Sequence, residues 1–307
     1  MSALRDVWAE TLIELAEDCP HLLVLDGDLA NSTRADRFAL AYPGRFFQMG
    51  IAEQNLMGVA AGLAHGGFIP WLSSFAVFFT HRAADPLRML VAQTGANVKI
   101  GAAYSGLLTG YTGKTHQDVE DLAILRAMPH MTVLAPMDGP ECREMTRWAT
   151  AHPGPVYLRL ARDPVEGPAF PREPLSGQPR LLREGDDLAL VSTGPQSLRC
   201  WEAAELLARR GIQARVVHLG FLKPTDQPAL CAALQGVPVV VTAEEHSVLG
   251  GLGGLVAELL SAQAPRRVLR LGLEDTFGES ASNQELLELH GLSPQRMAQR
   301  IESEMLR

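Results

Sequence analysis

A single carboxylate, Glu53, stands at the start of a segment that is otherwise apolar. It lies in residues 50–55 (Gly-Ile-Ala-Glu-Gln-Asn), and Leu56, Val59 and Leu63 follow at helical spacing. A carboxylate on such a helix would be removed from water, and a buried carboxyl either pairs with a cation or takes up a proton. A protonated Glu53 can donate a hydrogen bond to a ring nitrogen of a ligand. The alternative is a structural carboxylate that the helix dipole stabilises.

Aromatic side chains gather in residues 73–81, which contain three of the ten phenylalanines. Because they are spaced as i and i+3, Phe75 and Phe78 are predicted to share one face of a helix. A flat heterocycle needs such an aromatic face to stack on. The alternative is that the cluster belongs to the hydrophobic core, as most aromatic clusters do.

A glycine-rich loop at residues 110–118 (Gly-Tyr-Thr-Gly-Lys-Thr-His-Gln-Asp) carries a lysine and a histidine and precedes a helical pattern at residues 119–128. In open α/β sheets, loops at the carboxyl ends of parallel strands bind ligands. His116, two residues after Lys114, is therefore a candidate for proton transfer or for anion binding.

The hydrophobic pattern predicts the elements that position these segments. Short apolar runs alternate with amphipathic helices, which indicates an α/β fold with mainly parallel sheets covered on both faces. The expected strands are residues 22–25, 98–102, 132–136, 156–160, 188–192, 214–219, 237–243 and 267–271. The expected helices are residues 7–16, 53–64, 119–128, 140–149, 197–210, 228–234, one that begins near residue 253, and two at the end of the chain.

A proline-rich stretch divides the chain. Residues 163–178 contain four prolines and two glycines and have little apolar periodicity, which is typical of an exposed linker. We therefore predict two doubly wound domains, residues 1–163 and 185–307, joined by a linker at residues 164–184.

Composition and charge narrow the class of protein. The chain is 47% hydrophobic and 20% charged, as soluble globular proteins are. Its formal net charge of −8 argues against non-specific binding to nucleic acid or to an anionic membrane. No apolar run approaches the ~20 residues that span a bilayer, no signal peptide is visible, and the four cysteines lack metal-ligand spacing. We expect a cytoplasmic protein with no metal site of its own.

In their order along the chain, these segments resemble the pyrimidine-binding domain of the transketolase family. The shared motifs are Gly-Ile-x-Glu, Ser-Phe-x-x-Phe, Gly-x-Thr-His-Gln and, at residues 129–136, Pro-x-Met-Thr-Val-x-x-Pro. Residues 243–253 resemble the family's C-terminal domain, with the nearest similarity to deoxyxylulose-phosphate synthases and 2-oxo-acid dehydrogenase beta subunits. The resemblance covers essentially the whole chain, and the shared order of the motifs makes it specific.

The resemblance implies that the chain binds thiamine diphosphate. Glu53 would contact N1′ of the coenzyme's aminopyrimidine and activate the coenzyme, and Phe75 and Phe78 would stack on that ring. Asp28 and Leu29 match the family's loop near the thiazolium.

The resemblance also implies a set of residues that face the substrate. His116 would stabilise a developing alkoxide or transfer a proton, while Lys114 and Arg162 would bind anionic ends of the sugar. Arg162 matches the family's phosphate-binding arginine better than Arg159 does, and Arg5 is a further candidate. The remaining candidates are Ser32, His81, Tyr104 and Thr112.

The loop at residues 110–117 departs from the family pattern Gly-Glu-Asp-Gly-Pro-Thr-His-Gln. Its matched positions are Tyr111, Thr112 and Lys114, and Tyr104 replaces the family's donor-site histidine. A hydroxyl can still hydrogen-bond but loses the charge-assisted contact of a carboxylate, and Lys114 adds a cation. We therefore expect an unusual ketose donor with an anionic group, with xylulose 5-phosphate as an alternative.

A second departure concerns the diphosphate. The family holds the diphosphate and its metal ion with a Gly-Asp-Gly motif in a separate N-terminal domain, for which this chain has no room. The similar residues 26–28 lie at a strand end. The resemblance therefore implies the C-terminal subunit of a split transketolase. An N-terminal subunit would hold the diphosphate and Mg²⁺ (or Ca²⁺) in an α2β2 heterotetramer.

The expected reaction is transfer of a two-carbon ketol unit from a ketose to an aldose. One alternative is a subunit that acts on a 2-oxo acid, as in deoxyxylulose-phosphate synthases and 2-oxo-acid dehydrogenases. The other is a non-catalytic partner of a related enzyme. The Thr-His-Gln and Pro-x-Met-Thr-Val motifs favour the transketolase reaction, and the intact Glu53 with both phenylalanines argues against a non-catalytic partner.

Overall fold

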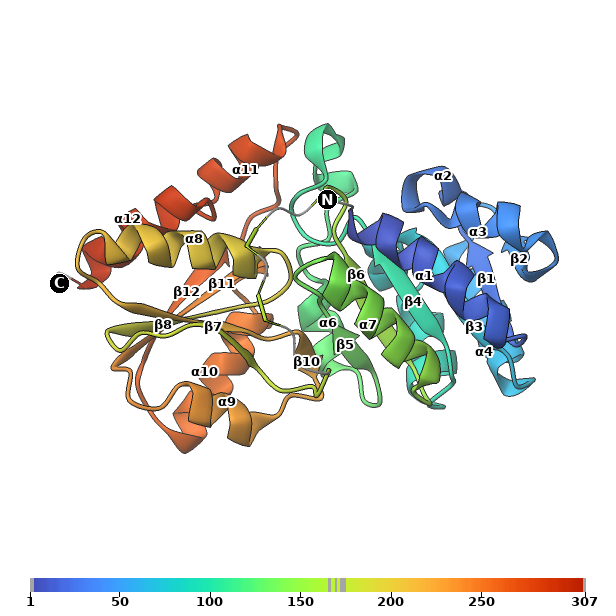
Figure 1. Ribbon diagram of the computed structural model, residues 1–307. Helices are drawn as coiled ribbons and strands as arrows, with labels where there is room; N and C mark the ends of the chain where they lie inside the picture. The colour runs from blue at the N-terminus through green and yellow to red at the C-terminus, as the bar shows by residue number, and fades with distance from the viewer. Residues whose placement is uncertain (1–2, 165–166, 169, 172–174, 306–307) are drawn as a thin grey trace.

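The computed structural model describes residues 3–164, 167–168, 170–171 and 175–305. Within them the chain forms two sheets that lie next to each other, each covered by helices on both faces (Figure 1). The predicted α/β class with two mainly parallel sheets is confirmed. Residues 165–166, 169 and 172–174 of the expected linker lie outside the described part of the chain.

The first sheet has seven strands in the order β10-β5-β6-β4-β3-β1-β2. All neighbouring strands run parallel except β10 and β5. The bounds are β1 Leu22–Asp26, β2 Phe46–Gln48, β3 Ile69–Phe75, β4 Lys99–Ala103, β5 Thr132–Leu134, β6 Val156–Leu160 and β10 Phe221–Lys223. The central strands are buried along nearly their whole length, as strands covered on both faces must be.

The second sheet has five strands in the order β12-β11-β8-β9-β7. Only β7 is antiparallel to its neighbour. The bounds are β7 Arg180–Arg183, β8 Leu188–Ser192, β9 Ala214–His218, β11 Val239–Ser247 and β12 Arg267–Leu273.

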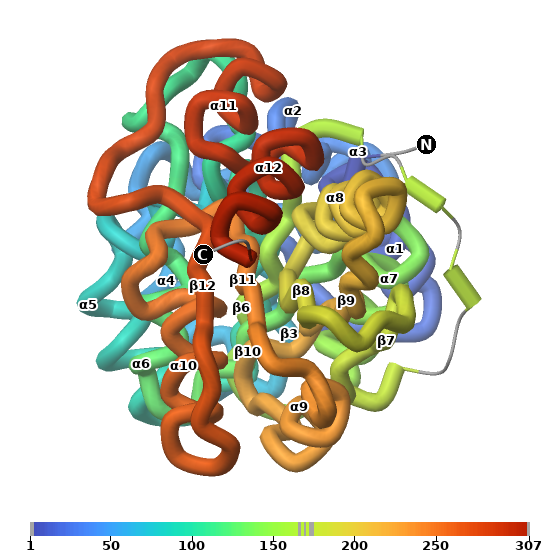
Figure 2. The backbone as a smooth tube through the Cα atoms, turned by 90° about the vertical axis from the view of Figure 1, so that its left-hand side faces the viewer, coloured from blue at the N-terminus to red at the C-terminus, as the bar shows by residue number. Residues whose placement is uncertain are grey.

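Helices cover both sheets. Their bounds are α1 Leu4–Asp18, α2 Ala30–Thr33, α3 Ala35–Ala41, α4 Glu53–His65, α5 Ala84–Pro86, α6 Asp121–Ala127, α7 Gly139–Ala151, α8 Gln196–Ala208, α9 Gln227–Ala233, α10 Leu252–Gln263, α11 Asn283–Leu289 and α12 Pro294–Met305, with short helical turns η1 Pro43–Arg45, η2 Phe78–Arg82, η3 Leu87–Ala92 and η4 Gly110–Thr115. Helix α12 lies alongside α8 on the second sheet (Figure 2). No helix in the described ranges is long and apolar enough to cross a membrane.

The two faces of the first sheet belong to different hydrophobic cores. Leu22 and Val24 of β1 point into the core beneath α1 and α7, and Leu23 and Leu25 point into the core beneath α4. The α4 core continues without interruption into the second domain, where it includes residues of β8, β9 and α10. The two domains are therefore joined by buried apolar surface as well as by the linker.

The prediction that Phe75 and Phe78 share one face of a helix is wrong. Phe75 is the last residue of β3, and Phe78 begins the π-helical turn η2. The segment becomes a strand because β3 pairs with β1 on one side and with β4 on the other. Both pairings come from distant parts of the chain, so local spacing could not indicate them.

Two strands depart from the expected division into domains and linker. β7 lies within residues 164–184, the expected linker, and pairs with β9. β10 belongs to the second domain in sequence but extends the first sheet, where Phe221 pairs with Leu134 of β5.

Candidate functional site

The candidate residues gather at the carboxyl edge of the first sheet. Phe75 ends β3, Tyr104 follows β4, and Arg162 follows β6. Because these strands are parallel neighbours, their carboxyl ends open on the same edge. Glu53 reaches this edge as the first residue of α4.

Glu53 is buried and ion-paired. Its side chain is 2% exposed, and Arg82 Nη1 donates to Oε1 at 3.2 Å and to Oε2 at 3.3 Å. Of the two states expected for a buried carboxyl, the structure therefore contains the pair with a cation. Sequence reasoning missed Arg82, because nothing in the spacing of residues 53 and 82 indicates a contact.

Three rings pack together near Glu53, whose ion-pair partner Arg82 lies on the ring of Phe78. The rings of Phe75 and Phe78 are stacked, with their centroids 5.8 Å apart and an interplanar angle of 23°. His116 meets both rings edge-on, at centroid distances of 5.8 Å and 5.6 Å. Thr115 Oγ1 lies 2.8 Å from Nδ1 of His116 and holds the imidazole in this orientation.

A buried carboxylate shapes the loop after β1. Asp26 accepts hydrogen bonds from the backbone N–H groups of Leu29 and Ala30 at 2.9 and 3.1 Å, and from Ser73 Oγ at 2.8 Å. Leu29 consequently packs against the cluster of Phe75 and its neighbours. The side chain of Asp28 is exposed, with a left-handed backbone (φ 67°).

Two arginines flank Tyr104. The Tyr104 ring stacks on Phe75 at a centroid distance of 3.9 Å, and its hydroxyl accepts from Arg5 Nη1 at 2.9 Å. Arg5 Nη1 also donates to the backbone carbonyl of Ser32 at 2.6 Å. The guanidinium carbons of Arg5 and Arg162 each lie 5.4 Å from the Tyr104 centroid. In both arginines Nε is buried and has no hydrogen-bond partner among the described residues, so this group of residues has unused donors for an anion.

The other predicted substrate residues lie apart from this group. Thr112 donates its hydroxyl to Thr109 Oγ1 at 2.7 Å, and Lys114 is exposed on η4. His81 pairs with Glu120 at 2.7 Å. The structure thus brings Arg5, Ser32, Tyr104 and Arg162 together, but not Thr112, Lys114 and His81.

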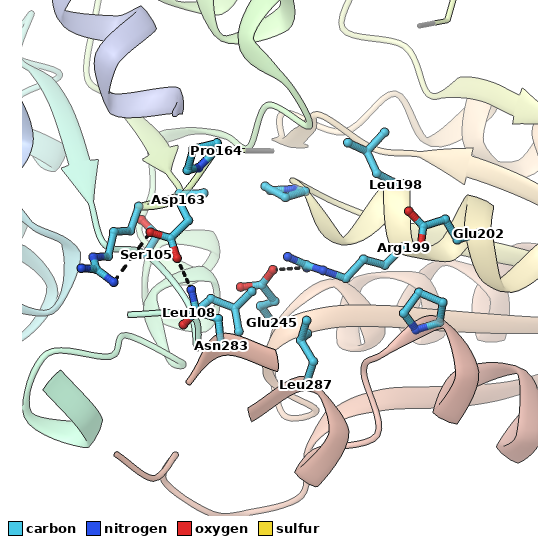
Figure 3. A pocket seen from close by; sticks show the side chains of 14 residues that line it. Ser105, Leu108, Asp163, Pro164, Leu198, Arg199, Glu202, Glu245, Asn283 and Leu287 are labelled. Atoms are coloured by element: carbon cyan, nitrogen blue, oxygen red, sulfur yellow. Dashed lines mark hydrogen bonds and ion pairs between the residues drawn. The ribbon is translucent and has the colours of Figure 1, made fainter. Parts of the chain in front are cut away.

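The second domain supports the loop that carries His116. Asn283 Oδ1 accepts from the Gly110 N–H at 2.8 Å, and its amide nitrogen donates to Asp163. Asp163 and Asn283 border a cavity of about 400 Å³ between the domains, where Arg199 pairs with Glu245 (Figure 3). The cavity includes Arg162 in its wall but not Glu53 or the phenylalanines.

Asp118 links the loop that carries His116 to the turn η2. Sequence reasoning also missed this contact. Asp118 is 1% exposed and accepts from Thr80 Oγ1, in the turn that begins with Phe78, at 2.6 Å. Burial, together with the neighbouring charge of Asp121, raises the pKa of Asp118 to about 7. Asp118 therefore joins the His116 loop to η2 through a carboxyl that titrates near neutral pH.

We expect Asp118→Asn to gain stability relative to the wild type as pH rises from 5 to 8. A carboxyl whose pKa is raised by folding stabilises the fold at low pH, and this contribution is lost as pH rises through about 7. Asparagine cannot ionise. Urea unfolding at pH 5, 6, 7 and 8 measures the effect, with the exposed Asp85→Asn as control. A difference between Asp118→Asn and wild type that is the same at every pH would contradict the assignment.

Both halves of the chain match models of known domains. Residues 1–167 match the model described as transketolase, pyrimidine binding domain, and residues 177–297 match transketolase, C-terminal domain. This chain belongs to the transketolase family. The resemblance inferred from the motifs is therefore confirmed.

Relatives of this transketolase-family chain include proteins of similar length. It is 40% identical over 306 residues to a putative transketolase C-terminal section of Methanocaldococcus jannaschii, covering 98% of this chain and 96% of that protein. It is 39% identical over 291 residues to a 6-deoxy-6-sulfo-D-fructose transketolase subunit of Clostridium sp., covering 94% and 90%. A solved structure described as a split gene transketolase, inactive beta4 tetramer, is 42% identical, with a TM-score of 0.91 and coverage of 100% and 99%.

The transketolase family implies thiamine diphosphate as coenzyme, and the residues around Glu53 fit its aminopyrimidine. The carboxylate of Glu53 and the ring of Phe78 both contact the guanidinium of Arg82, and Ser74 Oγ is buried with no hydrogen-bond partner among the described residues. A Cβ atom on Gly27 would lie 3.2 Å from Ser74 Oγ and 3.7 Å from Glu53 Oε1, so glycine at this position leaves room beside both side chains. Within the described ranges, no group of three or more His, Cys, Asp or Glu side chains could hold a metal ion.

Proposed function

We propose that this chain is the C-terminal subunit of a two-chain transketolase that depends on thiamine diphosphate and transfers a two-carbon ketol unit from an anionic ketose to an aldose. The observation that carries the proposal is the buried carboxylate of Glu53 beside the stacked rings of Phe75 and Phe78. The names of the relatives from Methanocaldococcus and Clostridium support the same assignment.

The proposal includes a partner. An N-terminal subunit would hold the coenzyme's diphosphate and its Mg²⁺ or Ca²⁺, and the two kinds of chain would form an α2β2 heterotetramer. Relatives that are named as a C-terminal section, as a subunit and as a split-gene product support a divided enzyme.

When bound, thiamine diphosphate supplies the carbon nucleophile that takes up the ketol unit. The residues of this chain then have separate tasks. Glu53 exchanges a proton with N1′ of the aminopyrimidine, and Phe75 and Phe78 orient that ring. Leu29, which packs against the cluster of Phe75 and Tyr104, would help to exclude water there. His116, which lies against both phenylalanines, moves a proton to or from the sugar hydroxyl next to the bond that breaks.

The group of Arg5, Ser32, Tyr104 and Arg162 would bind the anionic end of the ketose. Among the described residues, Nε of each arginine is buried without a hydrogen-bond partner, and the ion pair of Arg162 with Asp163 is long, at 3.7 Å. A phosphate or a sulfonate offers oxygens in the geometry that a guanidinium binds best. The name of the Clostridium relative, which acts on a sulfonated fructose, supports an acidic donor.

We expect Arg162→Ala to raise KM for a phosphorylated or sulfonated ketose by about 10- to 100-fold, since a hydrogen bond to a charged group contributes about 1.5–3 kcal/mol. The KM for an uncharged ketose should change less than about threefold. Steady-state kinetics of the assembled enzyme measures both values, with the exposed Arg88→Ala as control. Equal losses for charged and uncharged donors would show that Arg162 does not bind the anion.

Co-expression with the N-terminal subunit tests the function as a whole. The purified complex, supplied with thiamine diphosphate and Mg²⁺, is assayed for ketol transfer from a panel of ketose phosphates and sulfonates. We expect transfer from at least one acidic ketose. Release of CO₂ from pyruvate without transfer from any ketose would instead favour an enzyme that acts on 2-oxo acids. Absence of both activities would favour a non-catalytic subunit.

A further inference from the structure

Arg82 makes two contacts that the proposed reaction does not require. Its guanidinium carbon lies 3.8 Å from the centroid of the Phe78 ring, which places the flat cation on the aromatic face. At the same time Nη1 donates to both carboxylate oxygens of Glu53, at 3.2 and 3.3 Å. Arg82 therefore lies between the two groups that the coenzyme's aminopyrimidine would contact.

We propose that Arg82 is a built-in occupant of the pyrimidine site, which pairs with Glu53 in the absence of coenzyme and leaves when the coenzyme binds. This inference rests on the proposed function, in which Glu53 and Phe78 contact the aminopyrimidine. The shared chemistry is a flat, nitrogen-bearing group that stacks on Phe78 and hydrogen-bonds to a buried carboxylate. The two groups need the same space, so they exclude each other.

The burial of the two partners explains why the pair can open. The Glu53 side chain is only 2% exposed, whereas the Arg82 side chain is 47% exposed. Arg82 itself can therefore turn into water, because its end of the pair is already hydrated, and the coenzyme would have to replace its hydrogen bonds to the buried Glu53. Glu53 cannot follow it, since it is the first residue of α4 and is held within the core.

Departure of Arg82 frees the carboxylate oxygens of Glu53. While the pair is closed, Arg82 Nη1 donates to both of them. The exchange of Arg82 for the coenzyme therefore makes the carboxyl available to the aminopyrimidine, and before that exchange the ion pair compensates the buried charge.

The first test measures affinity for thiamine diphosphate with Mg²⁺ by isothermal titration calorimetry of the complex with the N-terminal subunit. If the Arg82–Glu53 pair is closed in about nine molecules of ten, Arg82→Gln should bind about tenfold more tightly than wild type, because the competing state is removed. Arg82→Lys, which keeps the charge but loses the flat stacking group, should lie in between. Arg88→Gln, which removes a nearby exposed arginine, serves as the matched control and should bind as wild type does.

The second test uses a double variant. Glu53→Gln removes the carboxylate with which Arg82 pairs. In this background Arg82→Gln should change the affinity for the coenzyme by less than about threefold, because the ion pair that competes with the coenzyme is already absent.

These results separate the present inference from the proposed function. If the wild-type complex and Arg82→Gln both fail to bind the coenzyme, the proposed function is wrong and the inference with it. If wild type binds but Arg82→Gln binds equally or more weakly, only the inference is overturned, and weaker binding would identify Arg82 as a coenzyme ligand. An equally large effect of Arg82→Gln on affinity in the Glu53→Gln background would likewise overturn it.

Discussion

Replacement of Glu53 by glutamine should lower kcat for ketol transfer by about 10²- to 10⁴-fold, the range in which a positioned acid–base group contributes to catalysis. Glutamine has nearly the same shape and can still hydrogen-bond, but it cannot exchange a proton with N1′. Glu53→Ala should abolish turnover altogether. Because Glu53 lies at the first position of α4 and its loss removes a buried charge from the core, both variants should fold and assemble with the partner.

The measurement is ketol transfer by the assembled enzyme, together with size-exclusion chromatography to confirm assembly. Glu120→Gln is a suitable control, because this carboxylate lies near the same turn and pairs with His81 at 2.7 Å. The control should lose only a few-fold in kcat, as expected for a half-exposed pair. Full activity in Glu53→Gln would rule out its assignment as the group that activates the coenzyme.

A second large effect is expected on stability, from the buried pair of Asp121 and Arg159. Asp121 accepts from Arg159 Nε at 2.8 Å, from Arg159 Nη2 at 3.1 Å and from the Tyr157 hydroxyl at 2.8 Å. Arg159 is 7% exposed and also donates to the backbone carbonyl of Glu245 in the second domain at 2.9 Å. Asp121→Ala would leave the guanidinium buried without a counter-charge, which costs about 3–5 kcal/mol.

Urea unfolding of the chain tests this prediction through the unfolding free energy. The double variant Asp121→Asn with Arg159→Met, which removes both charges, should recover part of the loss, because no unpaired charge stays buried. A loss below about 1 kcal/mol for Asp121→Ala would mean that water or a shift of the second domain compensates Arg159. The structure thus separates the two arginines considered from the sequence: Arg159 joins the domains, and Arg162 lies beside Tyr104.

Much of the fold follows from the pattern of hydrophobic residues. The strands β1, β6 and β8 appear where the sequence predicts them, because strands buried on both faces must be nearly continuous apolar runs. β3 was not predicted, since it contains Pro70 and two serines and owes its conformation to pairing with β1 and β4. β10 could not be assigned to the first sheet for a similar reason, as its partner β5 lies far away in sequence.

The sequence by itself determined the family of this protein and the residue types at its candidate site, because motifs that bind one coenzyme need fixed spacing within single segments. It placed Glu53 at the start of a buried helix and paired Phe75 with Phe78. Only the tertiary structure decided what surrounds them. The contact of Arg82 with Glu53 joins residues 29 positions apart in the chain, and the contact of Asp118 with Thr80 joins residues 38 positions apart. They form because parallel strands bring their carboxyl ends to one edge, a consequence of sheet order that no local pattern contains.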